Sequence, residues 1–279
     1  MKKLAASAFV GALLFGGTVA GAAVARTQAT TIQVSTAMNA AQEVPAPTGN
    51  VAGARGTFTA TVSRTDTGAT LNWQLTFTGL TGAAGAAHIH RAPQGQPGGV
   101  VVPLCGPCQS PASGSANVDA SVLEALQTGG TYMNVHTATN APGEIRGQIG
   151  VMATVRTSLS SRQEVPRPKG SVRQAEGTFT ATVRKSGTTG TLVWRLSFSD
   201  LTGRALAAHI HIGRRGQAGP VGVALCGPCR NGVRRSTPLT AAVLSALEAG
   251  RAYVNVHTAR NQAGEIRGQI AAVPLRITP

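Results

Sequence analysis

The sequence predicts an all-β protein built as two tandem Greek-key barrels or sandwiches, each with one short helix. Runs such as residues 56–62 alternate apolar and polar side chains, which is typical of half-buried antiparallel strands. Turns rich in Gly and Pro separate these runs, and the 279 residues include 35 Gly and 15 Pro. Two stretches of more than 100 residues repeat each other at an offset of 121. Short strands, frequent turns and a duplication together indicate two β-sandwich or barrel domains.

The repeat defines the domain organisation. Gly-Glu-Ile-Arg-Gly-Gln-Ile at residues 143–149 returns at residues 264–270. A period of 121 residues indicates tandem whole domains, because the units of a solenoid are only about 20 to 50 residues long. We therefore expect one domain at residues 30–152 and a second at residues 153–276.

The first 25 residues are typical of a secretory signal peptide. Two lysines precede an apolar run at residues 4–15, and small residues lead to Ala25, after which we expect cleavage. The apolar run is too short to cross a hydrocarbon core of about 30 Å, and no later segment is apolar enough to do so. The sequence thus predicts a secreted or periplasmic protein without a transmembrane segment.

The elements of the first copy follow from local patterns. Residues 91–111 are rich in Gly and Pro and are predicted to form a loop. A short helix should begin at Asp119 or Ser121, both able to cap it, and end at Gly129-Gly130. Residues 153–161 should serve as both the linker and the first strand of the second copy. Strands are expected at residues 31–38, 56–62, 71–77, 132–137 and 144–151 and around the first histidine pair, with a hairpin turn at 64–68.

The positive charge lies almost entirely in the second copy. Residues 26–154 contain five Arg and five Asp or Glu, whereas residues 155–279 contain eighteen Lys or Arg against five Asp or Glu, net +13. The pair Arg214-Arg215 and the cluster at 230–235 could attract anionic envelope polymers, anionic lipid head groups or small anions. The alternative is an ordinary solvated face. Export and the lack of an aromatic-rich surface argue against a nucleic-acid partner.

All six histidines fall into two sets with one pattern, a His-x-His pair followed by Asn-Val-His-Thr. The two residues of each pair project from the same strand face, about 6.6 Å apart. A third imidazole from a neighbouring strand could complete a metal site with an open fourth position, and three neutral nitrogens suit copper or zinc. The alternative is that the rings bond to loop carbonyls and brace the sheet. The predicted metal ligands are His88, His90, His136, His209, His211 and His257.

The same alternation sorts the last predicted strand of the first copy. Ile145 and Ile149 should face the core, which leaves Glu144, Arg146 and Gln148 pointing outward.

Each copy contains Cys-Gly-Pro-Cys, a thioredoxin-type tetrapeptide. It lies in a predicted loop without a surrounding βαβ unit, which argues against the redox role of that motif. In an oxidising compartment we expect one local disulfide per domain, with redox catalysis and a Cu(I)-binding thiolate pair as alternatives. The cysteines are Cys105 and Cys108 in the first copy and Cys226 and Cys229 in the second.

Four motifs stand out in the first copy, at residues 86–90, 104–106, 132–137 and 143–148, and the second copy matches at 253–258 and 264–269. Together they resemble the chordin-type domain, CHRD. The resemblance implies an immunoglobulin-like β-barrel module, found in extracellular developmental regulators and exported microbial proteins, and it implies no established enzyme activity.

The chain is less closely similar to copper/zinc superoxide dismutase, which also has a His-x-His strand, a late Val-His and an arginine near its end. That resemblance implies a superoxide-dismutase-like Greek-key barrel with copper on the three histidines. Arg146, and Arg267 in the second copy, would guide the anion. The chain lacks the bridging histidine and the zinc-binding loop, and Gln148 replaces a disulfide cysteine.

These observations favour an exported binding or envelope-associated module with one copper ion per domain, copper being favoured over zinc. A copper-only dismutase and a purely structural adhesion module are the alternatives, and a non-enzymatic role is favoured. A hydrolase is disfavoured because the chain has only ten Asp and Glu and no Gly-x-Ser-x-Gly.

Overall fold

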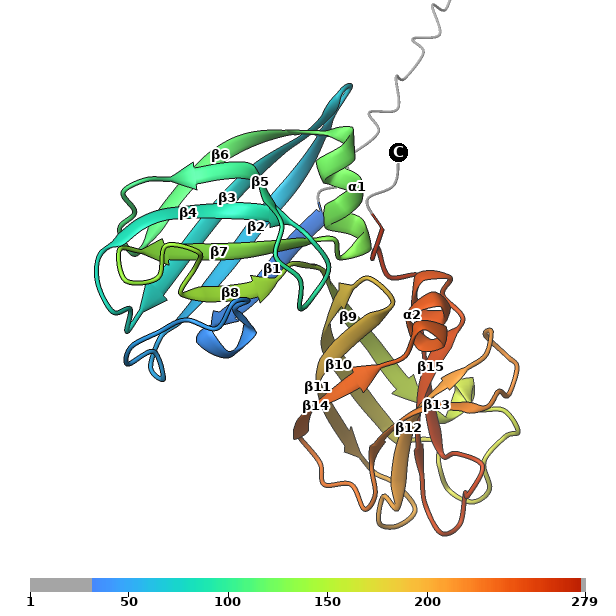
Figure 1. Cartoon of the computed structure of the whole chain (residues 1–279). Coiled ribbons are helices and arrows are strands. Elements are labelled where there is room, and N and C mark those ends of the chain that lie inside the picture. Colours follow the sequence, from blue (N-terminus) through green and yellow to red (C-terminus); the bar gives the residue numbers. More distant parts are fainter. Residues whose placement is uncertain (1–31, 277–279) are drawn as a thin grey trace, which may run out of the picture.

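The computed structural model describes residues 32–276, so the predicted signal peptide lies outside the described residues. Figure 1 shows two β-rich lobes that follow one another along the chain, which confirms the all-β prediction with two domains and short helices. No helix in the described part of the chain is long and apolar enough to cross a membrane. The first lobe contains β1 (Ile32–Asn39), β2 (Arg55–Thr65), β3 (Gly68–Thr78), β4 (Ala84–Arg91), β5 (Gly99–Cys105), β6 (Ala112–Asp119), α1 (Ala120–Thr128), β7 (Thr131–Thr137) and β8 (Ile145–Gln148).

The second lobe repeats this order. It contains β9 (Gly150–Ser160), β10 (Glu176–Ser186), β11 (Thr189–Ser199), β12 (Ala207–Ile212), β13 (Val221–Cys226), β14 (Val233–Leu239), α2 (Ala241–Glu248), β15 (Ala252–His257) and β16 (Ile266–Ile270). Short 3-10 turns, Ala40–Gln42 and Ser161–Gln163, follow the first strand of each lobe.

Each domain consists of two four-stranded antiparallel sheets. Their strand orders are β6-β3-β2-β1 and β8-β7-β4-β5 in the first domain, and β14-β11-β10-β9 and β16-β15-β12-β13 in the second. The two sheets of a domain are linked by one residue pair, Asn39 with Arg146 or Ser160 with Arg267. In the described residues no pairing joins β5 to β6 or β13 to β14. Each domain is thus a Greek-key sandwich of two sheets, which are joined along one edge and not along the other.

Strand β9 belongs to both domains. Residues 150–152 pair with β1 of the first domain, and residues 151–160 pair with β10 of the second. The predicted linker at 153–161 therefore forms a strand, as expected, and the domain boundary predicted after residue 152 falls inside it. The strand predicted at 144–151 is interrupted at Ile149, so its two parts are β8 and the start of β9.

Period-two alternation places the core between the two sheets. In β2, Phe58, Ala60 and Val62 are buried while the threonines between them are exposed or half-buried, as predicted. Helix α1 closes one end of the first core with Val122, Leu123 and Leu126. Of the two possible caps, Asp119 is the one that accepts a hydrogen bond, from the backbone N–H of Val122.

Two strands were not predicted. The segment 91–111, expected to be a loop, contains β5, and residues 112–119, for which no strand was expected, form β6. Both are edge strands, where short polar segments and a proline such as Pro103 are tolerated because one side of the strand needs no partner. Strand β5 also pairs with β4 through irregular register, which weakens any sequence pattern.

Candidate metal centre

The three histidines of the first domain lie on the face of the β4-β7-β8 sheet that points away from the core. Cross-strand pairing places His88 opposite Asn134, His90 opposite Tyr132, and His136 opposite Ala86. The alternation that turns these rings outward buries Ile89 completely in the core. The fold therefore brings the His-x-His strand next to the strand of the third histidine, as predicted.

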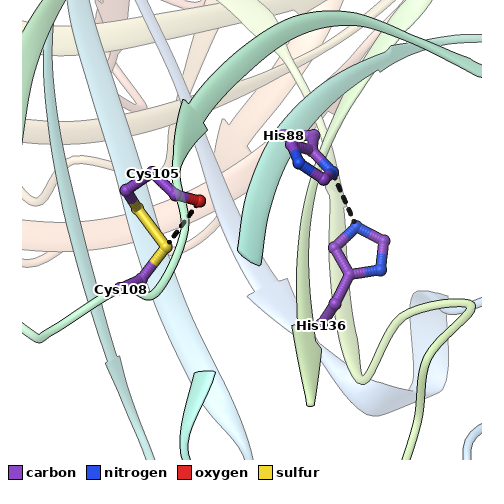
Figure 2. Close-up of a disulfide and its surroundings, with 4 residues drawn as sticks. All are labelled: His88, Cys105, Cys108 and His136. Carbon is purple, nitrogen blue, oxygen red and sulfur yellow. Dashed lines mark hydrogen bonds between the residues drawn. A yellow bond between two sulfur atoms is a disulfide. The ribbon is translucent and has the colours of Figure 1, made fainter. Parts of the chain in front are cut away.

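The three rings converge at their nitrogen atoms. His136 Nε2 lies 3.2 Å from His88 Nδ1, a contact drawn in Figure 2, and 3.3 Å from His90 Nε2. The other nitrogen of His90 lies 2.9 Å from the Gly98 carbonyl oxygen. The other nitrogen of His136 lies 2.9 Å from the Ala141 carbonyl oxygen. A carbonyl only accepts, so both Nδ1 atoms carry the proton and both Nε2 atoms keep a free lone pair.

These separations fit one shared metal ion. Nitrogen atoms bound to one ion at about 2.05 Å lie about 3.3 Å apart in tetrahedral geometry and about 2.9 Å apart at right angles. The two measured distances, 3.2 and 3.3 Å, fall within this range. In each domain one nitrogen per histidine can be chosen so that the three lie within 4.8 Å of one another. Both triads could thus hold a metal ion.

The second domain repeats the arrangement and adds an unsatisfied atom. His209 Nδ1 lies 3.0 Å from His257 Nε2. The Nδ1 atoms of His211 and His257 are held by the carbonyl oxygens of Gly219 and Gln262, at 2.8 and 2.9 Å. The other nitrogen of His211, Nε2, is buried and has no hydrogen-bond partner among the described residues. A buried lone pair of this kind is costly unless a donor or a cation satisfies it.

Burial keeps all six imidazoles neutral. It lowers the pKa of every histidine in the two triads. The neighbouring histidines add to this effect at His88 and His209, and the two causes together lower the pKa of His209 to about 4. Neutral imidazole is the form that binds metal, so the site needs no deprotonation at neutral pH.

Arg146, Tyr132 and His90, the most buried histidine of the first triad, stack in a column. The Arg146 guanidinium carbon lies 3.5 Å from the centre of the Tyr132 ring, whose other neighbour is His90, with ring centres 5.0 Å apart and an interplanar angle of 16°. The Tyr132 hydroxyl oxygen accepts a hydrogen bond from the Gly98 N–H, and the Gly98 carbonyl accepts one from His90. The column therefore fixes the orientation of the imidazole. The second domain repeats it with Arg267, Tyr253 and His211.

The prediction that Glu144, Arg146 and Gln148 point outward is wrong about exposure. Arg146 and Gln148 lie on the face away from the core, but the relative exposures of Glu144, Arg146 and Gln148 are 0%, 1% and 7%. A loop covers Arg146 and Gln148, because the Ala92 carbonyl accepts a hydrogen bond from Gln148 and the Pro93 carbonyl accepts one from Arg146. Glu144 is instead enclosed by the donors Thr81, Thr137 and Asn140. Strand alternation assigns a side chain to a face and says nothing about what later packs over that face.

The roles of two buried carboxyl groups near the site were not predicted. The Glu144 carboxylate accepts hydrogen bonds from Thr137 and Asn140, at 2.6 and 3.0 Å, and so holds the turn whose carbonyl positions His136. Burial raises the pKa of Glu43 to about 7, and within residues 32–276 one of its oxygens has no hydrogen-bond partner. The signal that could have found both was present, since each lies in a motif repeated at the offset of 121.

The cysteines form a separate feature. Cys105 is bonded to Cys108 and Cys226 to Cys229, at the ends of β5 and β13. Figure 2 shows the first disulfide apart from the ring pair of His88 and His136. The dashed contact from Cys108 Sγ to the Cys105 carbonyl is not a true hydrogen bond, because a disulfide sulfur carries no proton. In this state the sulfurs offer no thiolate for Cu(I).

Comparison with known proteins identifies the family. No curated protein and no solved structure matches the chain significantly. The model of the CHRD domain family matches residues 34–149 and again residues 155–270, which together span most of the chain. The chain therefore belongs to the CHRD domain family and carries two copies of that domain in tandem.

Proposed function

We propose that this protein is an exported metal-binding module that holds one copper ion on the three histidines of each domain. The observation that carries the proposal is the pair of lone-pair nitrogens, His90 Nε2 and His136 Nε2, which face each other at 3.3 Å. Backbone carbonyls hold the proton on the other nitrogen of both rings. Two acceptors cannot hydrogen-bond to each other. His88 Nδ1 can donate to His136 Nε2, but His90 Nε2 then still faces an acceptor, and a shared cation would satisfy it.

A proton is a poor candidate for that cation at neutral pH. Burial lowers the pKa of both His90 and His136, which disfavours an imidazolium in this position. A bracing role would place a donor against each free nitrogen, yet His211 Nε2 is buried without a hydrogen-bond partner in residues 32–276. These observations favour metal binding over a purely structural role for the histidines.

The donor set favours copper. Each triad offers three neutral imidazole nitrogens, and no carboxylate belongs to either group of candidate ligands in the described residues. Copper stands highest in the affinity order of divalent first-row metals and suits imidazole ligands, with zinc next to it. His88 and His209 are only partly buried, which leaves one side of each triad open for a further ligand.

The proposal is limited to binding and does not include dismutation. An anion-guiding arginine must be reachable from solvent, whereas Arg146 and Arg267 are each 1% exposed and stacked on tyrosine rings. Their placement supports a role in orienting the histidine ligands.

Metal stoichiometry tests the proposal. Mature protein loaded with copper and dialysed should retain about two ions per chain. His88→Ala/His90→Ala and His209→Ala/His211→Ala should each retain one, and the variant with all four changes none. Thr139→Ala, an exposed change on the turn beside His136, is the matched control and should retain two. Wild-type protein that retains no copper would refute the proposal, and loading with equimolar copper and zinc checks the choice of metal.

Export is part of the same proposal. Residues 1–25 have the composition of a signal peptide, so a chain without them should stay in the cytoplasm while the full chain appears, shortened, in the exported fraction. Mass spectrometry of the exported N-terminus should place the cleavage after Ala25. Recovery of the full-length chain from the cytoplasm alone would contradict export.

A further inference from the structure

Three arginines form a straight row across the β14-β11-β10-β9 sheet of the second domain. Pairing between neighbouring strands places Arg156 opposite Thr180, Thr180 opposite Arg195, and Arg195 opposite Arg234. The row thus crosses β9, β10, β11 and β14 at one level. All three arginines are exposed. Arg156 and Arg195 alternate with buried residues along their strands, and Arg234 lies directly opposite Arg195, so the three side chains share the solvent face.

The row has no evident structural purpose. Like charges directly opposite each other in a sheet destabilise it, and Arg195 and Arg234 are such a pair. Both salt bridges in residues 32–276 are made by Glu248, with Lys185 and Arg276, so no carboxylate neutralises the row. An uncompensated row of this kind indicates a ligand that supplies the negative charge.

The first domain provides the internal comparison. Its corresponding groove is lined by uncharged residues and has a volume of about 450 Å³. The groove of the second domain, about 620 Å³, is lined by the three arginines of the row, by Arg235 and by threonines. The positions equivalent to Arg156, Arg195 and Arg234 are Ser35, Gln74 and Ser113. The fold therefore does not require arginine at any of these three positions.

We propose that this arginine row binds an acidic polysaccharide chain laid across the strands. Three strand spacings separate Arg156 from Arg234, about 14 Å, which is too far for one small anion to bridge and suits a chain with repeated charges. Thr154, Thr180 and Thr182 line the same groove and can hydrogen-bond to sugar hydroxyls. The site is separate from the metal centre and does not depend on the proposed function.

Other anionic partners fit this face less well. Single-stranded nucleic acid is usually held by aromatic stacking, but the aromatic residue of the groove, Trp194, is 2% exposed and lies in the core. Stable binding to a membrane surface usually combines basic residues with inserted apolar side chains, and Val193 is the one large exposed hydrophobic residue that lines this groove in the described part of the chain.

Exchange between the two domains tests the inference. Arg156→Ser/Arg195→Gln/Arg234→Ser gives the second domain the residues of the first, and it should weaken binding of dextran sulfate and polygalacturonate at least tenfold. The slope of log affinity against log salt should fall by about three, one for each arginine that neutralises an anionic group. The control Arg204→Gln/Arg214→Gln/Arg215→Gln removes the same charge elsewhere and should weaken binding less than threefold. Grafting Ser35→Arg/Gln74→Arg/Ser113→Arg onto the first domain should strengthen binding.

Several outcomes would overturn the inference. An equal loss in the row variant and in the control would mean that net charge alone is responsible. Tighter binding to duplex DNA or to phosphatidylglycerol vesicles than to either polysaccharide would assign the row to another partner. Neutral dextran is the uncharged control and should not bind, so binding of dextran would also contradict the inference. The row variant should melt at or above the wild-type temperature, because it removes an opposed pair of like charges, so lost binding cannot be attributed to unfolding.

Discussion

Each buried polar group around the first histidine triad has a counterpart 121 residues later, whereas the surfaces above the two triads differ in charge. Tyr132 and Arg146 correspond to Tyr253 and Arg267, with almost the same stacking distances. The loops beside the triads differ: Pro93, Gln94 and Thr139 are replaced by Arg214, Arg215 and Arg260. The two copies share the buried polar groups, so they share the chemistry of the site. They differ in surface charge, so they can attract different partners.

The largest expected effect concerns the buried arginines. Arg267→Ala should lower the free energy of unfolding of its domain by about 3 to 5 kcal/mol, and Arg146→Ala by about 2 to 3 kcal/mol. The difference arises because Arg267 donates to two backbone carbonyls at 2.8 and 2.9 Å. Arg146 donates to one at 3.2 Å, and its second terminal nitrogen has no partner in the part of the chain that the structure describes.

Each domain contains one tryptophan, which allows the two arginine variants to be compared within the whole chain. Urea unfolding followed by Trp73 in a Trp194→Phe background reports on the first domain, and the reverse replacement reports on the second. Arg64→Ala and Arg251→Ala, at exposed positions, are the controls. Equal losses for Arg146→Ala and Arg267→Ala would show that the extra hydrogen bonds contribute nothing.

Acid should release the metal from both domains at a pH well below 6.5. Protons compete with the ion only when the pH approaches the pKa of the free histidines, which burial lowers in all six and to about 4 in His209. Affinity should therefore change little from pH 7 to pH 6 at either site, and at the second site it should fall at least about tenfold as the pH passes through 4. Copper absorbance of the two single-site variants during acid titration checks this, and release centred at pH 6.5 would contradict the lowered pKa values.

Surface charge should make the two metal sites unequal at low salt. The second domain carries a net charge of +13 and the first is neutral, so a cation should bind the first site about tenfold more tightly at 10 mM salt, where screening extends over about 30 Å. At 1 M salt the screening length falls to about 3 Å and the difference should nearly vanish. Chelator competition on the two single-site variants measures both affinities. A difference that persists at high salt would point to the geometry of the triads instead.

The smallest effect is expected at the helix caps. Asp119 accepts from the Val122 N–H at 2.9 Å, whereas Thr240 accepts from the Val243 N–H at 3.4 Å. Asp119→Ala should therefore cost about 1 kcal/mol and Thr240→Ala about 0.5 kcal/mol. The same tryptophan probes measure both. Equal costs would mean that the longer contact caps as well as the shorter one.

The sequence predicted much of the fold because strong periodic signals coincide with central strands. The run at residues 56–62 has a buried face set by Phe58, Ala60 and Val62, and the structure confirms it as part of β2. Strands β5 and β6 have no such pattern, since an edge strand needs neither a continuous apolar face nor a partner on both sides. Pairing with a distant segment decides whether such a stretch becomes a strand, and the local sequence carries no information on that pairing.

The sequence also predicted part of the candidate site. The error at Arg146 has a cause related to the missed strands. Period two placed His88 and His90 on one face, and the repeated Asn-Val-His-Thr supplied His136 as the third ring. The same rule pointed Arg146 outward, where the structure buries it under the loop that begins at Ala92. Which loop covers a sheet face depends on the packing of distant segments, and periodicity along one strand carries no information on that packing.

The sequence by itself determined the duplication, the all-β class, the grouping of all six histidines and the concentration of positive charge in the second copy, because each is a property of residue order or composition. Tertiary structure alone decided the facing of two lone pairs at His90 and His136, the burial of Arg146 against Tyr132, and the alignment of Arg156, Arg195 and Arg234 across four strands. These three features depend on strand register and loop coverage, which join residues far apart in the chain, and register is fixed only when the two sheets pack around their common core.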